Sequence, residues 1–268
     1  ASVHLRTGFL TATTSGVSIA KGDDLKITGT AMGDPSNVYV WIFGKNKQIL
    51  GASTTVESDG SFEYELRGGV TKEWSPGQYF VVIQHPMMDD AQGIFEGPAG
   101  WISGSLGSGF TSVDIGRLQA SDAANALIQA LDSPNIDDTY VKLTFNLEEP
   151  YIFIDSIGTK ESGSKFTVTG TTNVAVGDKL IVDVTSAAFG PTVKTEGAGF
   201  GSVSGTAVVE KGDSANKWSF EIDATDLKPD QYIVKVESIE TETTATANFN
   251  LVEATETTPP VDEVTTPP

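Results

Sequence analysis

Residues 74–83 have the sequence Trp-Ser-Pro-Gly-Gln-Tyr-Phe-Val-Val-Ile, and residues 227–236 have the sequence Leu-Lys-Pro-Asp-Gln-Tyr-Ile-Val-Lys-Val. In both copies a proline presets a tight turn, and a tyrosine then begins a run of residues typical of strands. A tyrosine so placed can bury its ring while its hydroxyl bonds the backbone of the turn, as in the tyrosine corner of immunoglobulin-like sandwiches. Because the chain has no cysteine, the disulfide-centred core of antibody domains is excluded, and the repeat predicts only the general sandwich architecture.

Further segments recur in the same order on both sides of this stretch. Most of them alternate apolar and polar side chains, as half-buried strands do. Residues 22–31 match residues 163–172, residues 38–43 match 180–185, residues 60–66 match 217–222, and residues 140–148 match 245–253. We therefore predict an all-β chain of two tandem Ig-like antiparallel β-sandwiches, over residues 1–149 and 150–254. A Thr/Pro-rich acidic stalk is expected over residues 255–268.

The first copy carries an insertion at about residues 86–138 that the second copy lacks. One short helix is predicted in it, over residues 121–131, with Ser121 as the N-cap and Pro134 beyond its end. The apolar stripe of this helix is expected to pack on the sandwich itself, with a neighbouring subunit as the alternative. The stripe consists of Ala124, Leu127, Ile128 and Leu131.

Upstream of that helix, a glycine-rich loop carries more large apolar side chains than an exposed loop normally does. These side chains either fold under the helix or meet a partner, and we favour the partner. The candidate interface residues are Ile94, Phe95, Trp101, Ile102, Leu106 and Phe110, with Phe200 in a glycine-rich hairpin of the second copy. That hairpin lacks the strand-to-helix setting of a nucleotide-binding loop, so phosphate binding is not expected.

Residues suited to catalysis are few. The histidines are His4 and His85, so a three-histidine metal site is impossible. A Ser-His-Asp relay would need one of them beside Ser103, Ser105 or Ser108, and no Gly-x-Ser-x-Gly elbow surrounds these serines. We therefore expect no enzyme, no catalytic residue and no cofactor-binding residue.

Paired acids at the two ends of the insertion could share a hard cation such as Ca²⁺ through carboxylate oxygens. These weak calcium candidates are Asp89, Asp90, Asp137 and Asp138. They do not match the EF-hand pattern, so solvated turn acids are the preferred interpretation. No cofactor is expected, and Ca²⁺ is the one ion left open.

The charge balance bears on partners. With 36 acidic and 17 basic residues the net charge is −19, which repels nucleic acid. No apolar run is long enough to span a bilayer, so membrane contact is expected only through an anchor beyond Pro268. The stalk suits O-linked sugar, for which the candidates are Thr255, Thr257, Thr258, Thr265 and Thr266.

Four stretches, at residues 22–30, 38–44, 77–86 and 123–132, together resemble a family of cell-surface proteins of methanogenic archaea. The resemblance covers the chain up to the stalk. It implies an archaeal envelope or S-layer role, with sandwich ectodomains on a Thr/Pro-rich spacer before a C-terminal anchor, and it carries over no catalytic residue.

Two hypotheses follow from the sequence. The first is an extracellular structural subunit of a surface layer, sheath or other cell-envelope assembly, whose partner is a second copy of itself. The alternative is a surface adhesin or glycan-binding module that uses Trp41, Trp74 or Trp101 as a stacking platform. Within this alternative, Trp41 is expected to belong to the core.

Overall fold

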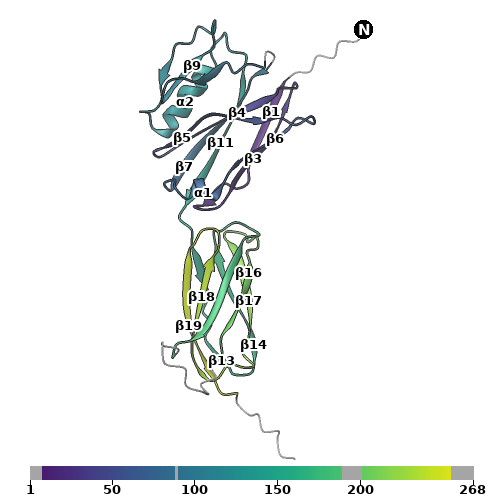
Figure 1. The fold of residues 1–268 in the computed structure, drawn as a ribbon, viewed down its shortest axis with the longest axis vertical. Coiled ribbons are helices and arrows are strands. Elements are labelled where there is room, and N and C mark those ends of the chain that lie inside the picture. Colours follow the sequence, from purple (N-terminus) through teal and green to yellow (C-terminus); the bar gives the residue numbers. More distant parts are fainter. Residues whose placement is uncertain (1–7, 88–89, 189–200, 255–268) are drawn as a thin grey trace, which may run out of the picture. The chain divides into compact units, whose positions relative to one another are not determined.

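A computed structural model describes residues 8–87, 90–188 and 201–254. The chain divides into two compact units, Ala1–Pro150 with Asn173–Ala175, and Tyr151–Thr172 with Val176–Pro268. Each unit is a β-sandwich (Figure 1), so the predicted fold class is confirmed.

In the first unit, a three-stranded sheet of order β1-β3-β6 packs on a five-stranded sheet of order β2-β11-β7-β4-β5. The strands are β1 (Phe9–Thr14), β2 (Ser18–Ala20), β3 (Leu25–Met32), β4 (Asn37–Gly44), β5 (Lys47–Thr55), β6 (Ser61–Leu66), β7 (Gly77–His85) and β11 (Thr139–Glu148). All neighbours are antiparallel except β2 and β11, which are parallel. A helical turn, α1 (Gly68–Thr71), connects β6 towards β7.

The second unit repeats this topology strand for strand, with sheets of order β12-β14-β17 and β13-β19-β18-β15-β16. The strands are β12 (Ile152–Ile154), β13 (Thr159–Glu161), β14 (Lys165–Thr172), β15 (Lys179–Ser186), β16 (Val203–Val208), β17 (Asn216–Asp223), β18 (Asp230–Ser238) and β19 (Thr244–Val252). The parallel pair recurs between β13 and β19. The internal repeat in the sequence is therefore a repeat of one three-dimensional module.

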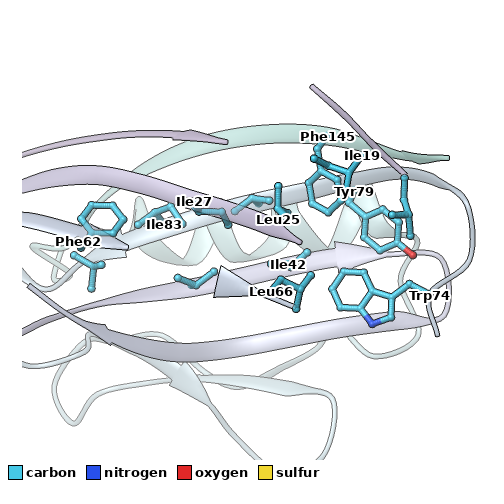
Figure 2. Packing of buried hydrophobic residues seen from close by; sticks show 14 of the residues in the cluster. Ile19, Leu25, Ile27, Ile42, Phe62, Leu66, Trp74, Tyr79, Ile83 and Phe145 are labelled. Atoms are coloured by element: carbon cyan, nitrogen blue, oxygen red, sulfur yellow. The ribbon is translucent and has the colours of Figure 1, made fainter. Parts of the chain in front are cut away.

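The predicted tyrosine corner is present in both units. The hydroxyl of Tyr79 donates a 2.8 Å hydrogen bond to the carbonyl oxygen of Ser75, and the hydroxyl of Tyr232 donates a 3.0 Å bond to that of Lys228. The Tyr79 ring stacks on Phe145 with centroids 5.2 Å apart, deep in the first core (Figure 2). The repeated motif thus fixes the turn to the core.

The glycine of each Thr-Gly-Thr motif lies where two strands and an aromatic ring meet. A Cβ on Gly29 would lie 2.0 Å from the carbonyl oxygen of Thr11 and 2.5 Å from the ring of Phe62. A Cβ on Gly170 would lie 1.9 Å from the carbonyl oxygen of Phe153. Only glycine lets the ring and the neighbouring backbone occupy this space.

The insertion contains more regular structure than the sequence predicted. Besides the helix it forms a three-stranded antiparallel sheet of order β10-β9-β8, with β8 (Ile94–Glu96), β9 (Trp101–Gly104) and β10 (Val113–Asp114). The amide of Trp101 donates a 2.8 Å bond to the carbonyl of Pro98, and Gly100 has a φ of +81°. The glycines therefore build a tight turn between β8 and β9, and the segment predicted as a glycine-rich loop is a regular β-hairpin here.

The predicted helix is α2 (Ala120–Leu131), and its cap differs from the prediction. Its N-cap is Gln119, with extended backbone and no side-chain cap bond, so Ser121 lies inside the first turn and is not the cap. The helix packs on its own sandwich, as favoured, because α2 contacts β4, β7 and β11. Leu127 and Leu131 are buried there.

Candidate interaction surface

The insertion covers a second apolar face of the first unit. In β4, alternate residues Val38, Val40 and Ile42 face the sandwich core, while Trp41 and Phe43 belong to a separate buried cluster with the insertion. A strand buried on both faces loses the alternation of polar and apolar residues. The five-stranded sheet of the first unit is therefore the middle layer of three.

The second unit has no insertion of this kind, and its residues that match Trp41 and Phe43 are polar. Register places Val40 opposite Ile83 and Val182 opposite Val236, so Trp41 corresponds to Asp183. Likewise Phe43 corresponds to Thr185. These replacements put Asp183 and Thr185 on the outer face of β15, beside the partly exposed Ile181, and this face can contact water. The presence of the insertion and the apolar outer face thus go together.

A buried polar network holds the insertion to the sheet. The indole Nε1 of Trp41 donates a 2.7 Å bond to Oε1 of Gln84, and Nε2 of Gln84 donates to the carbonyl of Ile94 at 3.0 Å and to Asp138 Oδ2. The amide of Gly93 donates a 3.0 Å bond to the same Asp138 oxygen. Since Gly93 and Asp138 stand near the two ends of the insertion, one carboxylate ties both ends to β7.

The calcium candidates are used in other ways. Asp90 accepts hydrogen bonds from the hydroxyl and the amide of Ser36, which lower its pKa. Asp137 is exposed, Asp138 is in the buried network, and Asp89 lies outside the described residues. Within residues 8–87, 90–188 and 201–254, no group of three or more His, Asp or Glu side chains could hold a metal ion.

Two of the partner candidates belong to the protein interior. Ile94 and Ile102 are fully buried in the cluster with Trp41, because β8 and β9 turn these side chains towards the sandwich. The expectation that they meet a partner is therefore corrected. Phe110 is half-buried against the same cluster.

Three candidates are exposed on the insertion. Phe95 is 37% and Trp101 38% exposed, and Leu106 is fully exposed. Phe95 lies opposite Ser103, and Trp101 is two residues before Ser103 on β9, so both rings are on the outward face of the small sheet. Leu118, which is 39% exposed beside the start of α2, was missed from the sequence, where it is a single leucine among polar residues.

The side chains considered for a catalytic relay have other roles. His85 is buried, with Nδ1 accepting a 2.8 Å bond from the amide of Met87 and Nε2 bonded to the carbonyl of Met32 at 3.0 Å. Both ring nitrogens are therefore engaged in hydrogen bonds with the backbone. The hydroxyls of Ser103 and Ser112 form a 2.8 Å hydrogen bond with each other. The hydroxyl of Ser108, which is buried, accepts a hydrogen bond from the backbone amide of Phe110.

Of the three tryptophans proposed as a stacking platform, two are buried and one is exposed. Trp41 is fully buried, as expected, and Trp74 is buried against Tyr79, so neither can stack on a sugar. Trp101 alone of the three presents its ring to solvent.

Several candidates lie outside the described residues. They are His4, Phe200 and the five threonines from Thr255 to Thr266 proposed to carry sugar. In the part of the chain that is described, no helix has the length and apolar character to cross a bilayer.

The sequence matches no protein-family model and no curated protein. Among solved structures, a tetra-tandem repeat from the extending region of a large adhesion protein is 15% identical, with a TM-score of 0.32 over 92% of this chain and 50% of that chain. A segment of titin is 8% identical, with a TM-score of 0.26 over 92% of this chain and 66% of that chain. A marsupial T cell receptor is 8% identical, with a TM-score of 0.28 over 94% of this chain and 75% of that chain. The chain spans half the length of the adhesion repeat.

Proposed function

We propose that this chain is a non-catalytic structural subunit of an extracellular surface layer or other cell-envelope assembly, and that it acts by self-association. The observation that carries the proposal is the outward face of the insertion, where Phe95 and Trp101 lie on the same face of the small sheet and Leu106 follows β9. Exposed aromatic side chains on a rigid platform are typical of protein contact surfaces.

The buried network beneath this face supports an interface and not a mobile loop. Because Gln84 and Asp138 hold the insertion to the sandwich, little conformational entropy is lost when the face meets a partner. A weak contact of this kind becomes effective when many copies are arrayed.

The net charge of −19 makes a prediction about salt. Two acidic copies repel each other at low ionic strength, and salt screens that repulsion without weakening apolar contacts. Self-association through the insertion should therefore strengthen as salt rises, whereas association through ion pairs would weaken.

Sedimentation velocity on the full chain tests this function. The double variant Phe95→Ser/Trp101→Ser should abolish salt-promoted association through the insertion. The control is Phe153→Ser, which removes an exposed aromatic side chain from the second unit and should leave association unchanged. A monomeric wild-type chain at every concentration and ionic strength would contradict the proposal.

A glycan-binding module is the second candidate, because Trp101 offers an exposed ring. A binding assay against oligosaccharides distinguishes the two: Trp101→Ala should then lose sugar binding in a chain that stays monomeric. The segment 255–268 is proposed as a glycosylated stalk, which mass analysis of the natural product would test.

A further inference from the structure

Among the described residues, β16 is an edge strand of the second unit. It pairs with β15 through six consecutive residue pairs, and among the described residues no strand pairs with the other side of Val203–Val208. Two residues further along, the backbone of Glu210 pairs with Lys217 of β17, so β17 lies beside the C-terminal end of this edge. The sequence of β16, Val-Ser-Gly-Thr-Ala-Val, contains neither a charged residue nor proline. Natural sheets usually protect such edges with charges, proline, bulges or a covering segment, because an open edge is a template for another strand.

The corresponding edge of the first unit, β5, is protected by two of these devices. The register between β4 and β5 shifts between Val40 and Ile42, which marks an irregularity of the bulge type. The insertion also runs beside it, since β8 contacts β5 and Nε2 of Gln48 donates to the carbonyl of Ile115. The first unit thus covers this edge with its insertion, whereas β16 has β17 beside its C-terminal end and no covering insertion among the described residues.

The direction of the β16 amides follows from its ladder. The amide of Val209 donates a 2.9 Å bond to the carbonyl of Asp178 on the β15 side. Because amide direction alternates along an antiparallel strand, the N–H and C=O groups of Ser204, Thr206 and Val208 point away from β15. The side chains of these three residues are exposed, so a second strand can approach.

We propose that β16 pairs antiparallel with β16 of a second copy, about a two-fold axis at Thr206. Each Thr206 then bonds its counterpart, and Ser204 of each copy lies opposite Val208 of the other, for about six main-chain hydrogen bonds. We take a second copy as the occupant because the pairing brings the six uncharged residues of one β16 against the six of the other, so that the paired strands add no repulsion between two chains of net charge −19.

This inference rests on the proposed function and adds a second contact to it. A single two-fold contact closes a dimer, whereas two different contacts on one chain generate an extended array. The insertion face and the β16 edge lie on different units, so together they meet that requirement.

The test compares three variants of the full chain at one position. Thr206→Pro removes the outward amide but keeps the ladder to β15, which an edge strand tolerates. Thr206→Lys places two like charges at the axis, and Thr206→Val is the matched control because it keeps the amide. Sedimentation velocity should show that the wild type and Thr206→Val form larger species, and that the other two variants lose at least tenfold in association constant. A folded Thr206→Pro chain that assembles like the wild type overturns the inference.

Hydrogen–deuterium exchange supplies an independent readout. In the wild type, the amides of Ser204, Thr206 and Val208 should exchange more slowly as concentration rises, and the same amides in Thr206→Lys should not. Unchanged exchange in an assembled wild type overturns the β16 contact and leaves the proposed function standing. A closed dimer that Thr206→Pro abolishes and Phe95→Ser/Trp101→Ser does not would support the contact and overturn the proposed extended assembly.

Discussion

The indole nitrogen of Trp41 donates a 2.7 Å hydrogen bond to the side-chain oxygen of Gln84, beneath the inserted layer and out of contact with water. Gln84 in turn donates to Asp138, so a strand of the sandwich and the end of the insertion share one network. This network gives the insertion a fixed place on the sheet.

Replacing Gln84 by leucine should therefore loosen the insertion. The change leaves the Trp41 N–H and the Asp138 carboxylate without this partner in the interior, which costs about 2–4 kcal/mol. Urea unfolding should show the loss, and chymotrypsin should cleave near Phe95 and Trp101 faster than in the wild type. Gln78→Leu, at an exposed position of the same strand, is the control, and equal effects of both variants would count against the network.

The two tyrosine corners should contribute similar stability. Tyr79→Phe and Tyr232→Phe each remove a hydroxyl bond to the backbone, and each should lower the free energy of unfolding by about 1 kcal/mol. Tyr64→Phe is a suitable control, because Tyr64 packs against the first core and its hydroxyl is not part of a corner. Urea titration that finds no loss in either corner variant would refute a structural role for the hydroxyls.

An added methyl group at the Thr-Gly-Thr glycines should be costly. Gly170→Ala places a Cβ 1.9 Å from the carbonyl oxygen of Phe153, so strands must move apart, at a cost of about 3 kcal/mol or more. Gly69→Ala is the control, since nothing lies within 4 Å of its Cβ position. Thermal melts should separate the two variants, and similar melting temperatures would contradict the packing at Gly170.

Asp90 gives a prediction in pH. Hydrogen bonds from Ser36 lower its pKa below the ordinary value of 3.8, so the folded state binds this proton less readily than the unfolded state. The stabilisation is present above the unfolded pKa and is lost as the pH falls through the lower folded pKa. NMR titration of the Asp90 carboxyl should show this, and Ser36→Ala should raise the midpoint. An ordinary midpoint in the wild type would contradict the contact.

The architecture could be predicted from the sequence because the repeated residues stand where the backbone geometry requires those residue types. Pro, Gln and Tyr recur where the chain turns into β7 and β18, and the glycine of Thr-Gly-Thr recurs where rings replace a Cβ. The second core also has a signal in the sequence. Val38-Tyr-Val-Trp-Ile-Phe43 is apolar at every position, as a strand buried on both faces is, whereas the matching Leu180-Ile-Val-Asp-Val-Thr185 is not.

The small sheet of the insertion was harder to predict. Its strands have two to four residues, too few for a period to stand out from the glycines around them. Without the pairing of β8 and β9, nothing in the sequence separates buried Ile94 and Ile102 from exposed Phe95 and Trp101. Ser121 is a better N-cap by residue type than Gln119, but the helix begins at Ala120 and the observed N-cap lies two residues before the predicted one.

The central claim is that the chain builds an extended assembly from copies of itself. Electron microscopy of the purified full chain at rising ionic strength tests it most directly. The account predicts ordered two-dimensional or tubular arrays from the wild type, and their loss in Phe95→Ser/Trp101→Ser and in Thr206→Pro. Dispersed single particles of the wild type at every concentration and salt would contradict it.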